Sequence, residues 1–248
     1  MTFLNELVDY SNDLLEINSV KDYCPNGLQV EGKSQIKRLV AGVTACQSLI
    51  DTAVERKADA LLVHHGFFWK GESPEVIGIR RQRLKTLLEH DISLLAYHLP
   101  LDKHRVYGNN ACLAEKLGFV VDSQDPQSLL WIGHLETPLS VKALSQHIGA
   151  RLLRAPLHIA ASSTIIETIG WCTGAAQSYI DRAADLGLDA YLSGEISEQT
   201  VHQAREYGVH YYAAGHHATE RYGVQAFGQH LAQRFNLSFE FIDVDNPV

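Results

Sequence analysis

Short apolar runs alternate with amphipathic stretches along most of the chain. Apolar runs of about four to eight residues are typical of buried strands, and apolar residues three and four positions apart are typical of helices. We expect strands at 38–44, 60–64, 92–97, 129–134, 164–173, 190–193, 209–213 and 237–242. Helices are expected at 47–57, 79–90, 110–117, 141–148, 177–186, 198–207 and 217–235. This alternation predicts an α/β fold with mixed sheets covered by helices.

Two segments of the chain, 130 positions apart, have closely similar sequences. Residues 45–62 and 175–192 align without a gap and are identical at nine of eighteen positions. A second correspondence relates residues 96–102 to residues 214–220. We therefore predict two intertwined α/β repeats that arose from an internal duplication and share one metal site. The expected bounds are 1–124 for the first repeat and 125–248 for the second.

The composition limits the classes of function. The chain has 248 residues, of which 46% are hydrophobic and 20% are charged, as in an ordinary folded protein. Its net charge of -8 gives no general signal for nucleic-acid binding. The four cysteines are scattered and form no C-x-x-C pair, which suits a reducing compartment. Because the chain shows neither a signal peptide nor a bilayer-length apolar run, we expect a cytoplasmic protein without a membrane partner.

Two adjacent histidines, His64 and His65, lie at the end of the strand expected at 60–64. Neighbouring side chains of a strand point to opposite faces, so both can reach one site only where the strand ends. Gly66 comes next and permits a turn. Since α/β sheets place ligands at the carboxyl ends of their strands, this pair is a candidate for metal binding. The alternative is one buried and one exposed histidine without a ligand.

Three further residues complete a set of metal donors. Asp102 follows the strand expected at 92–97, and His216 and Glu220 are four positions apart at the start of a helix, which places them on one face. With the histidine pair, and with His98 as an additional donor, the set exceeds the four ligands of a tetrahedral zinc site. It suits two divalent ions about 3.5–4 Å apart. Imidazole and carboxylate admit zinc, manganese, iron, cobalt or nickel.

Six short motifs along the chain resemble those of the Nif-three-like family, also known as GTP cyclohydrolase I type 2 proteins. They are NGLQVEG, LLVHHG, YHLPLD, GNN, LSGE and GHHATER. The resemblance implies a toroidal homohexamer, a GTP cyclohydrolase-like activity and dinuclear metal sites that face an internal cavity. The metal ligands it implies are His64, His65, Asp102, His216 and Glu220. The resemblance also implies that His98 is either a sixth ligand or a residue that supports the ligands from behind.

These observations favour a dinuclear metal-dependent hydrolase that cleaves a C–N or phosphoester bond with water activated between the ions. Glu195 could orient that water or accept its proton, and its alternative is a surface turn residue. The loop residues 103–105 could contact a small anionic or nucleotide-like substrate, or could simply be solvated. A second hypothesis is a ring-forming metal-binding scaffold without catalysis. An open coordination position would favour the hydrolase, and a closed shell would favour the scaffold.

Overall fold

A computed structural model describes all residues of the chain, from 1 to 248. The chain forms two compact units. Unit 1 comprises Met1–Gly108 and Arg221–Asp245, and unit 2 comprises Asn109–Glu220 and Asn246–Val248. These bounds differ from a single division at residue 124, because the chain returns to unit 1 within its longest helix. That helix, α9, spans His216–Phe235.

Unit 1 contains a five-stranded sheet in the order β13-β4-β5-β6-β2. Strands β13, β4, β5 and β6 run parallel to their neighbours, and β2 is antiparallel to β6. The bounds are β2 (Gly27–Val30), β4 (Arg38–Thr44), β5 (Ala60–His65), β6 (Ser93–Ala96) and β13 (Ser238–Phe241). A small antiparallel pair joins β1 (Thr2–Phe3) to β3 (Gln35–Ile36). The parallel core places the carboxyl ends of β5 and β6 at one edge.

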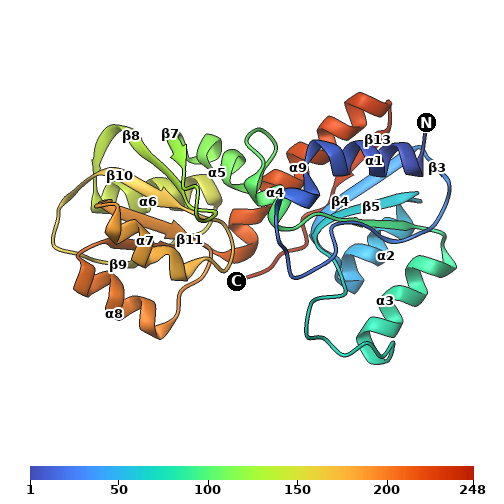
Figure 1. Ribbon diagram of the computed structural model, residues 1–248, viewed down its shortest axis with the longest axis horizontal. Helices are drawn as coiled ribbons and strands as arrows, with labels where there is room; N and C mark the ends of the chain where they lie inside the picture. The colour runs from blue at the N-terminus through green and yellow to red at the C-terminus, as the bar shows by residue number, and fades with distance from the viewer. The chain divides into compact units, whose positions relative to one another are not determined.

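Helices cover both faces of this sheet, as Figure 1 shows. Along β4, Leu39 and Ala41 pack with α1 and α9, whereas Val40 between them packs with α2 and α3. This follows from the two-residue period of a strand, since consecutive side chains point to opposite faces. Besides the part of α9 from Arg221 onward, the helices of the unit are α1 (Leu4–Leu14), η1 (Ile17–Ser19), α2 (Gln47–Glu55), α3 (Gly78–Glu89) and α4 (Leu99–Lys103).

Unit 2 contains a six-stranded sheet in the order β7-β8-β10-β11-β12-β9. Strands β10, β11 and β12 are parallel, and the outer strands are antiparallel to their neighbours. The bounds are β7 (Phe119–Gln124), β8 (Trp131–Ser140), β9 (Leu157–Ile159), β10 (Ile165–Trp171), β11 (Ala190–Ser193) and β12 (His210–Ala213). The sequence pattern did not predict β7 or β9. Both are edge strands, and β7 is largely exposed, so it lacks the apolar run of a buried strand.

The helices of unit 2 also lie on both faces of their sheet (Figure 1). Ile180 and Ala183 of α7 and Ala204 of α8 pack with Tyr191 and Tyr211 of the central strands. On the other face α6 contacts β8 and β10. The bounds are α5 (Asn109–Leu117), α6 (Val141–Leu152), η2 (Gln177–Tyr179), α7 (Ile180–Asp185) and α8 (Glu198–Tyr207). No helix in the structure combines the length and the apolar character needed to cross a bilayer.

The strand registers confirm the duplication. Leu39 pairs with Ala60 in unit 1, and Ile169 pairs with Ala190 in unit 2, so both members are shifted by 130 positions. The left-handed residue after the intervening helix is shifted equally, since Lys57 has φ 55° and Gly187 has φ 69°. The segments 45–62 and 175–192 therefore occupy the same strand–helix–strand surroundings.

The second correspondence has a different offset in the structure. Ala60 pairs with Ser93, and Ala190 pairs with His210, which gives an offset of 117 for the third strand of each unit. The helices that follow begin at Leu99 and His216, which is the same offset and aligns Asp102 with Thr219, one residue before Glu220. The match of residues 96–102 with 214–220 is therefore wrong by one position. The helix that follows the third strand presents its carboxylate one residue later in unit 2 than in unit 1.

Candidate metal centre

The end of β5 brings His64 and His65 together. Their ring centroids are 4.6 Å apart, although both residues still belong to the strand, and His64 is fully buried. The Nδ1 atom of His64 lies 2.9 Å from the carbonyl oxygen of Tyr97. Because a carbonyl can only accept, Nδ1 donates a proton, and in the neutral ring the lone pair is on Nε2. The backbone thus fixes His64 in the tautomer that binds a metal through Nε2.

His98 belongs to the same group of donors. It follows β6, which is parallel to β5, and its ring centroid lies 5.0 Å from that of His64 and 5.7 Å from that of His65. One ligand nitrogen from each of these three histidines lies within 4.8 Å of the others. The backbone N–H of His98 donates to Asn26 Oδ1 at 2.7 Å. The structure therefore places His98 among the candidate ligands.

Asp102 supplies a carboxylate beside these histidines. It lies in α4, is 5% exposed, and places Oδ1 3.6 Å from Nε2 of His64. Its backbone N–H donates to the carbonyl oxygen of His98 at 3.2 Å, which ties the short helix to the end of β6. Unit 1 alone thus contains three imidazoles and one carboxylate at the carboxyl edge of its sheet.

Unit 2 contains the pair formed by His216 and Glu220 in the first turns of α9. Nε2 of His216 lies 3.0 Å from Oε2 of Glu220, the expected contact between residues four apart on a helix. Gly174 packs directly against the pair. A Cβ atom at Gly174 would lie 2.0 Å from Glu220 Oε1 and 3.1 Å from His216 Nε2, and its φ is 68°. This position therefore requires glycine, a constraint that the sequence motifs did not reveal.

Glu195 contacts His216 from the other side. Nδ1 of His216 donates to Glu195 Oε1 at 2.7 Å. Burial acts to lower the pKa of His216, but the Glu220 and Glu195 carboxylates outweigh burial and raise that pKa to about 9. A divalent ion would displace the proton from Nε2 while Nδ1 keeps its bond to Glu195. The structure thus assigns Glu195 a contact with a candidate ligand.

Asp22 is a residue of this region that the sequence analysis missed. Its Oδ1 accepts from Nδ1 of His98 at 3.0 Å. Burial acts to raise the pKa of Asp22, yet the hydrogen bonds from His98 and Asn26 hold that pKa well below its usual range. Burial and the Asp22 charge raise the pKa of the neighbouring Cys24 thiol to about 12, so Cys24 stays protonated at neutral pH. Asn26 belongs to a recognised motif, but no local pattern marks Asp22.

Gly66 has a role different from the expected turn. Its φ is not positive, and a Cβ atom there would lie 2.2 Å from Gln29 Oε1 and 2.6 Å from Ala96 Cβ. Gln29 Oε1 accepts the backbone N–H of Phe67 at 2.7 Å. Glycine is therefore needed because Gln29 packs against the backbone that leaves the histidine pair.

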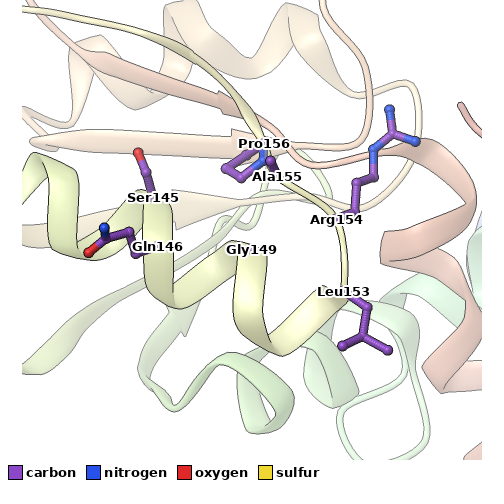
Figure 2. Close-up of a pocket in the computed structure, with 7 residues that line it drawn as sticks. All are labelled: Ser145, Gln146, Gly149, Leu153, Arg154, Ala155 and Pro156. Carbon is purple, nitrogen blue, oxygen red and sulfur yellow. The ribbon is translucent and has the colours of Figure 1, made fainter.

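Two other features lie apart from these donors. His104 Nδ1 accepts the N–H groups of Val106 and Tyr107, so its ring closes a local turn. A cavity of about 470 Å³ lies along α6 in unit 2, with Ser145 at one end and Arg154 at the other (Figure 2). No candidate metal ligand lines this cavity.

The donors present suit a divalent transition metal. Imidazole nitrogen and carboxylate oxygen are ligands that zinc, manganese, iron, cobalt and nickel accept, whereas magnesium and calcium prefer oxygen alone. His64 and His98 have their Nδ1 atoms committed to protein acceptors, as in many metal-binding histidines. The structure thus contains groups of residues that could hold a metal ion.

The fold and these donor groups define a duplicated α/β protein with candidate metal-binding residues. The chain belongs to the Duf34/NIF3 (NGG1p interacting factor 3) family, whose sequence model matches residues 2–247. A relative from Allochromatium vinosum, named GTP cyclohydrolase 1 type 2 homolog, is 52% identical and covers 100% of this chain and 98% of its own. A relative of the same name from Vibrio cholerae is 54% identical, with 96% of each chain covered.

A solved structure extends this similarity to three dimensions. The protein ybgI, described as being of unknown function, is 49% identical, matches with a TM-score of 0.97 and is covered over 100% of both chains. The structural similarity to ybgI thus covers the whole fold of this chain.

Proposed function

We propose that this protein is a metal-dependent hydrolase whose two divalent ions are held by donors from both units. The observation that carries the proposal is the convergence of three histidine ligand atoms within 4.8 Å at the carboxyl edge of the unit 1 sheet. Asp102 lies against the same group. The proposed ligands are His64, His65, Asp102, His216 and Glu220, with His98 as a sixth ligand or a group that supports the others.

The chemistry of the donors favours two ions over one. Five or six mixed donors exceed what one tetrahedral ion needs. A carboxylate is required between two dications, because their repulsion is strong at about 4 Å, and Asp102 or Glu220 can provide it. Such a pair of ions supplies, when bound, an activated water and a polarised substrate bond.

The surrounding residues have separate tasks in this proposal. Glu195 orients His216 through Nδ1, and the carbonyl of Tyr97 orients His64. Both contacts commit Nδ1 as a hydrogen-bond donor and direct Nε2 toward the ions, which displace the Nε2 proton of His216 when they bind. The name shared by the relatives favours a C–N bond of a nucleotide-like substrate, and a phosphoester is the second class that the same site could cleave.

The metal content of purified variants tests the proposal. We expect about two divalent ions per chain in the wild type by elemental analysis, and a marked loss in Glu220→Gln, which keeps the side-chain shape but removes the charge. His64→Ala should lose metal to a similar extent. His134→Ala is the matched control, because His134 is exposed and pairs only with Asp122. Unchanged metal content in Glu220→Gln would contradict the shared dinuclear site.

Activity of the metal-loaded protein separates the hydrolase from a scaffold. Nucleotides, cyclic amides and phosphoesters form the substrate panel, with His64→Ala as the inactive control. Turnover that requires both metal and His64 supports the hydrolase. A wild type that holds two ions in a closed shell and hydrolyses none of these classes would instead support a metal-binding scaffold.

A further inference from the structure

The carboxylate of Asp22 is held on several sides around His98. Oδ1 accepts from His98 Nδ1 at 3.0 Å, and Oδ2 accepts from the backbone N–H of Leu99 at 3.0 Å and from Asn26 Nδ2 at 2.9 Å. Its side chain is 3% exposed. An acceptor fixed by so many donors has little freedom to turn away from the imidazole.

These contacts determine the state of the His98 ring. A carboxylate only accepts, so His98 donates through Nδ1, and in the neutral ring the lone pair is on Nε2. The edge contacts of Tyr23 and Trp69, each with its ring centroid 5.0 Å from that of His98, restrict the ring further. Asn26 fixes the backbone through the N–H of His98. Both the tautomer and the orientation of the ring are therefore set by its neighbours.

The geometry points to Asp22 as a positioning residue that holds His98 ready to bind a metal ion through Nε2. A carboxylate on the far nitrogen of a ligating histidine fixes its tautomer and increases its basicity, and loss of such a group typically costs about 10–100-fold in metal affinity. This inference rests on the proposed function and makes His98 a ligand in its own right.

Unit 2 contains a comparable pair in which Glu195 accepts from His216. The two pairs differ in exposure, because the side chain of Asp22 is 3% exposed and that of Glu195 is 35% exposed. Solvent screens the more exposed carboxylate more strongly. We therefore expect removal of the Asp22 charge to weaken metal binding more than removal of the Glu195 charge.

Cys24 offers a competing explanation of the cluster. Ligand atoms of Asp22, Cys24 and His98 lie within 4.8 Å of one another, so the three could bind an ion directly. In that case Cys24→Ser would remove binding as strongly as Asp22→Asn. If Asp22 instead acts through His98, Cys24→Ser should bind nearly as well as the wild type.

Titration of the metal-free, full-length chain with Co²⁺, followed by visible absorption, tests the inference. Asp22→Asn should bind Co²⁺ about 10–100-fold more weakly, with an altered spectrum, and Asp22→Glu should recover part of the affinity. In a His98→Ala background, Asp22→Asn should cause no further loss, because the partner through which it acts is gone. Asp122→Asn is the matched control, since Asp122 forms an exposed carboxylate–histidine pair with His134.

The outcomes separate this inference from the proposed function. Three outcomes would overturn the role of Asp22 and leave the proposed function standing. They are wild-type affinity and spectrum in Asp22→Asn, additive losses when Asp22→Asn is combined with His98→Ala, and a loss in Cys24→Ser equal to that in Asp22→Asn. A wild type that binds no Co²⁺ would overturn the proposed function and this inference together. Thermal unfolding of the metal-free variants shows whether each of them is folded. If Asp22→Asn does not fold, the Co²⁺ affinity of Asp22→Glu is compared with that of the wild type instead.

Discussion

Asp59 and Asp189 make the same pair of hydrogen bonds in the two units. Oδ2 of Asp59 accepts the backbone N–H groups of Lys37 and Arg38 at 2.9 and 3.0 Å. Oδ2 of Asp189 accepts those of residues 167 and 168, each 130 positions later, at 3.0 and 2.8 Å. Asp59 thus anchors the start of β4, and Asp189 anchors β10 just before its parallel pairing with β11 begins at Ile169. The shared role explains why this position kept its residue through the duplication.

Substitution of either aspartate should destabilise the fold. Asp59→Asn or Asp189→Asn replaces two charge-assisted bonds by neutral ones, and we expect a loss of roughly 1–2 kcal/mol in the free energy of unfolding. Urea unfolding measures the change. Asp51→Asn is the control, because Asp51 is also shared by the two repeats but lies exposed on α2. Equal stability of the control and the Asp189 variant would contradict this role.

The same carboxyl groups predict a loss of stability in acid. Burial acts to raise the pKa of Asp59 and of Asp189, but the backbone donors outweigh burial and lower both pKa values. A lowered folded-state pKa stabilises the fold above the unfolded value of about 3.9, and the contribution disappears as the pH falls further. The urea concentration at the unfolding midpoint should therefore decrease as the pH is lowered below about 4. The Asp59→Asn, Asp189→Asn double variant should show a smaller fall, and an identical one would contradict the assignment.

Gly174→Ala should reduce metal binding through a steric effect. The new methyl group would overlap Oε1 of Glu220 and displace the carboxylate from His216. Gly187→Ala is a matched control, because Gly187 has φ 69° but no heavy atom within 4 Å of the added Cβ. Both variants should lose about 1–2 kcal/mol of stability from the left-handed backbone. Only Gly174→Ala should lose metal by elemental analysis, and equal metal content in the two variants would argue against the role of Glu220.

Glu195→Gln should weaken metal binding while leaving the fold intact. The amide can still contact His216 Nδ1, but it lacks the charge that raises the basicity of the ring. We expect an affinity loss of up to about tenfold, at the low end of such effects, since Glu195 is partly exposed. Glu198→Gln, in the first turn of α8, is the control. Wild-type Co²⁺ affinity in Glu195→Gln would show that its contact with His216 has no role in binding.

We expect six copies of the chain to assemble in solution. The expectation comes from the family resemblance, and light scattering coupled to size exclusion at several concentrations measures it. A mass of one chain, 27.6 kDa, across the concentration range would contradict it.

The sequence by itself determined the α/β class, the duplication and the residue types of the candidate metal centre. These features are encoded locally: apolar periodicity sets strands and helices, and the 130-residue repeat is visible without any coordinates. Tertiary structure alone decided the roles of Asp22, Gln29 and Gly174. Asp22 lies 76 positions before His98, and close packing of this kind leaves no periodic trace in the sequence.

The alignment of the third strands of the two repeats was likewise decided by the tertiary structure and not by the sequence. A match of short motifs paired Ala96 with Ala214 and Asp102 with Glu220, but the hydrogen-bonded ladders place Ala96 and Ala213 at equivalent positions, one residue earlier in unit 2. Register is set by long-range backbone hydrogen bonds, which a loop of different length can shift without changing either motif.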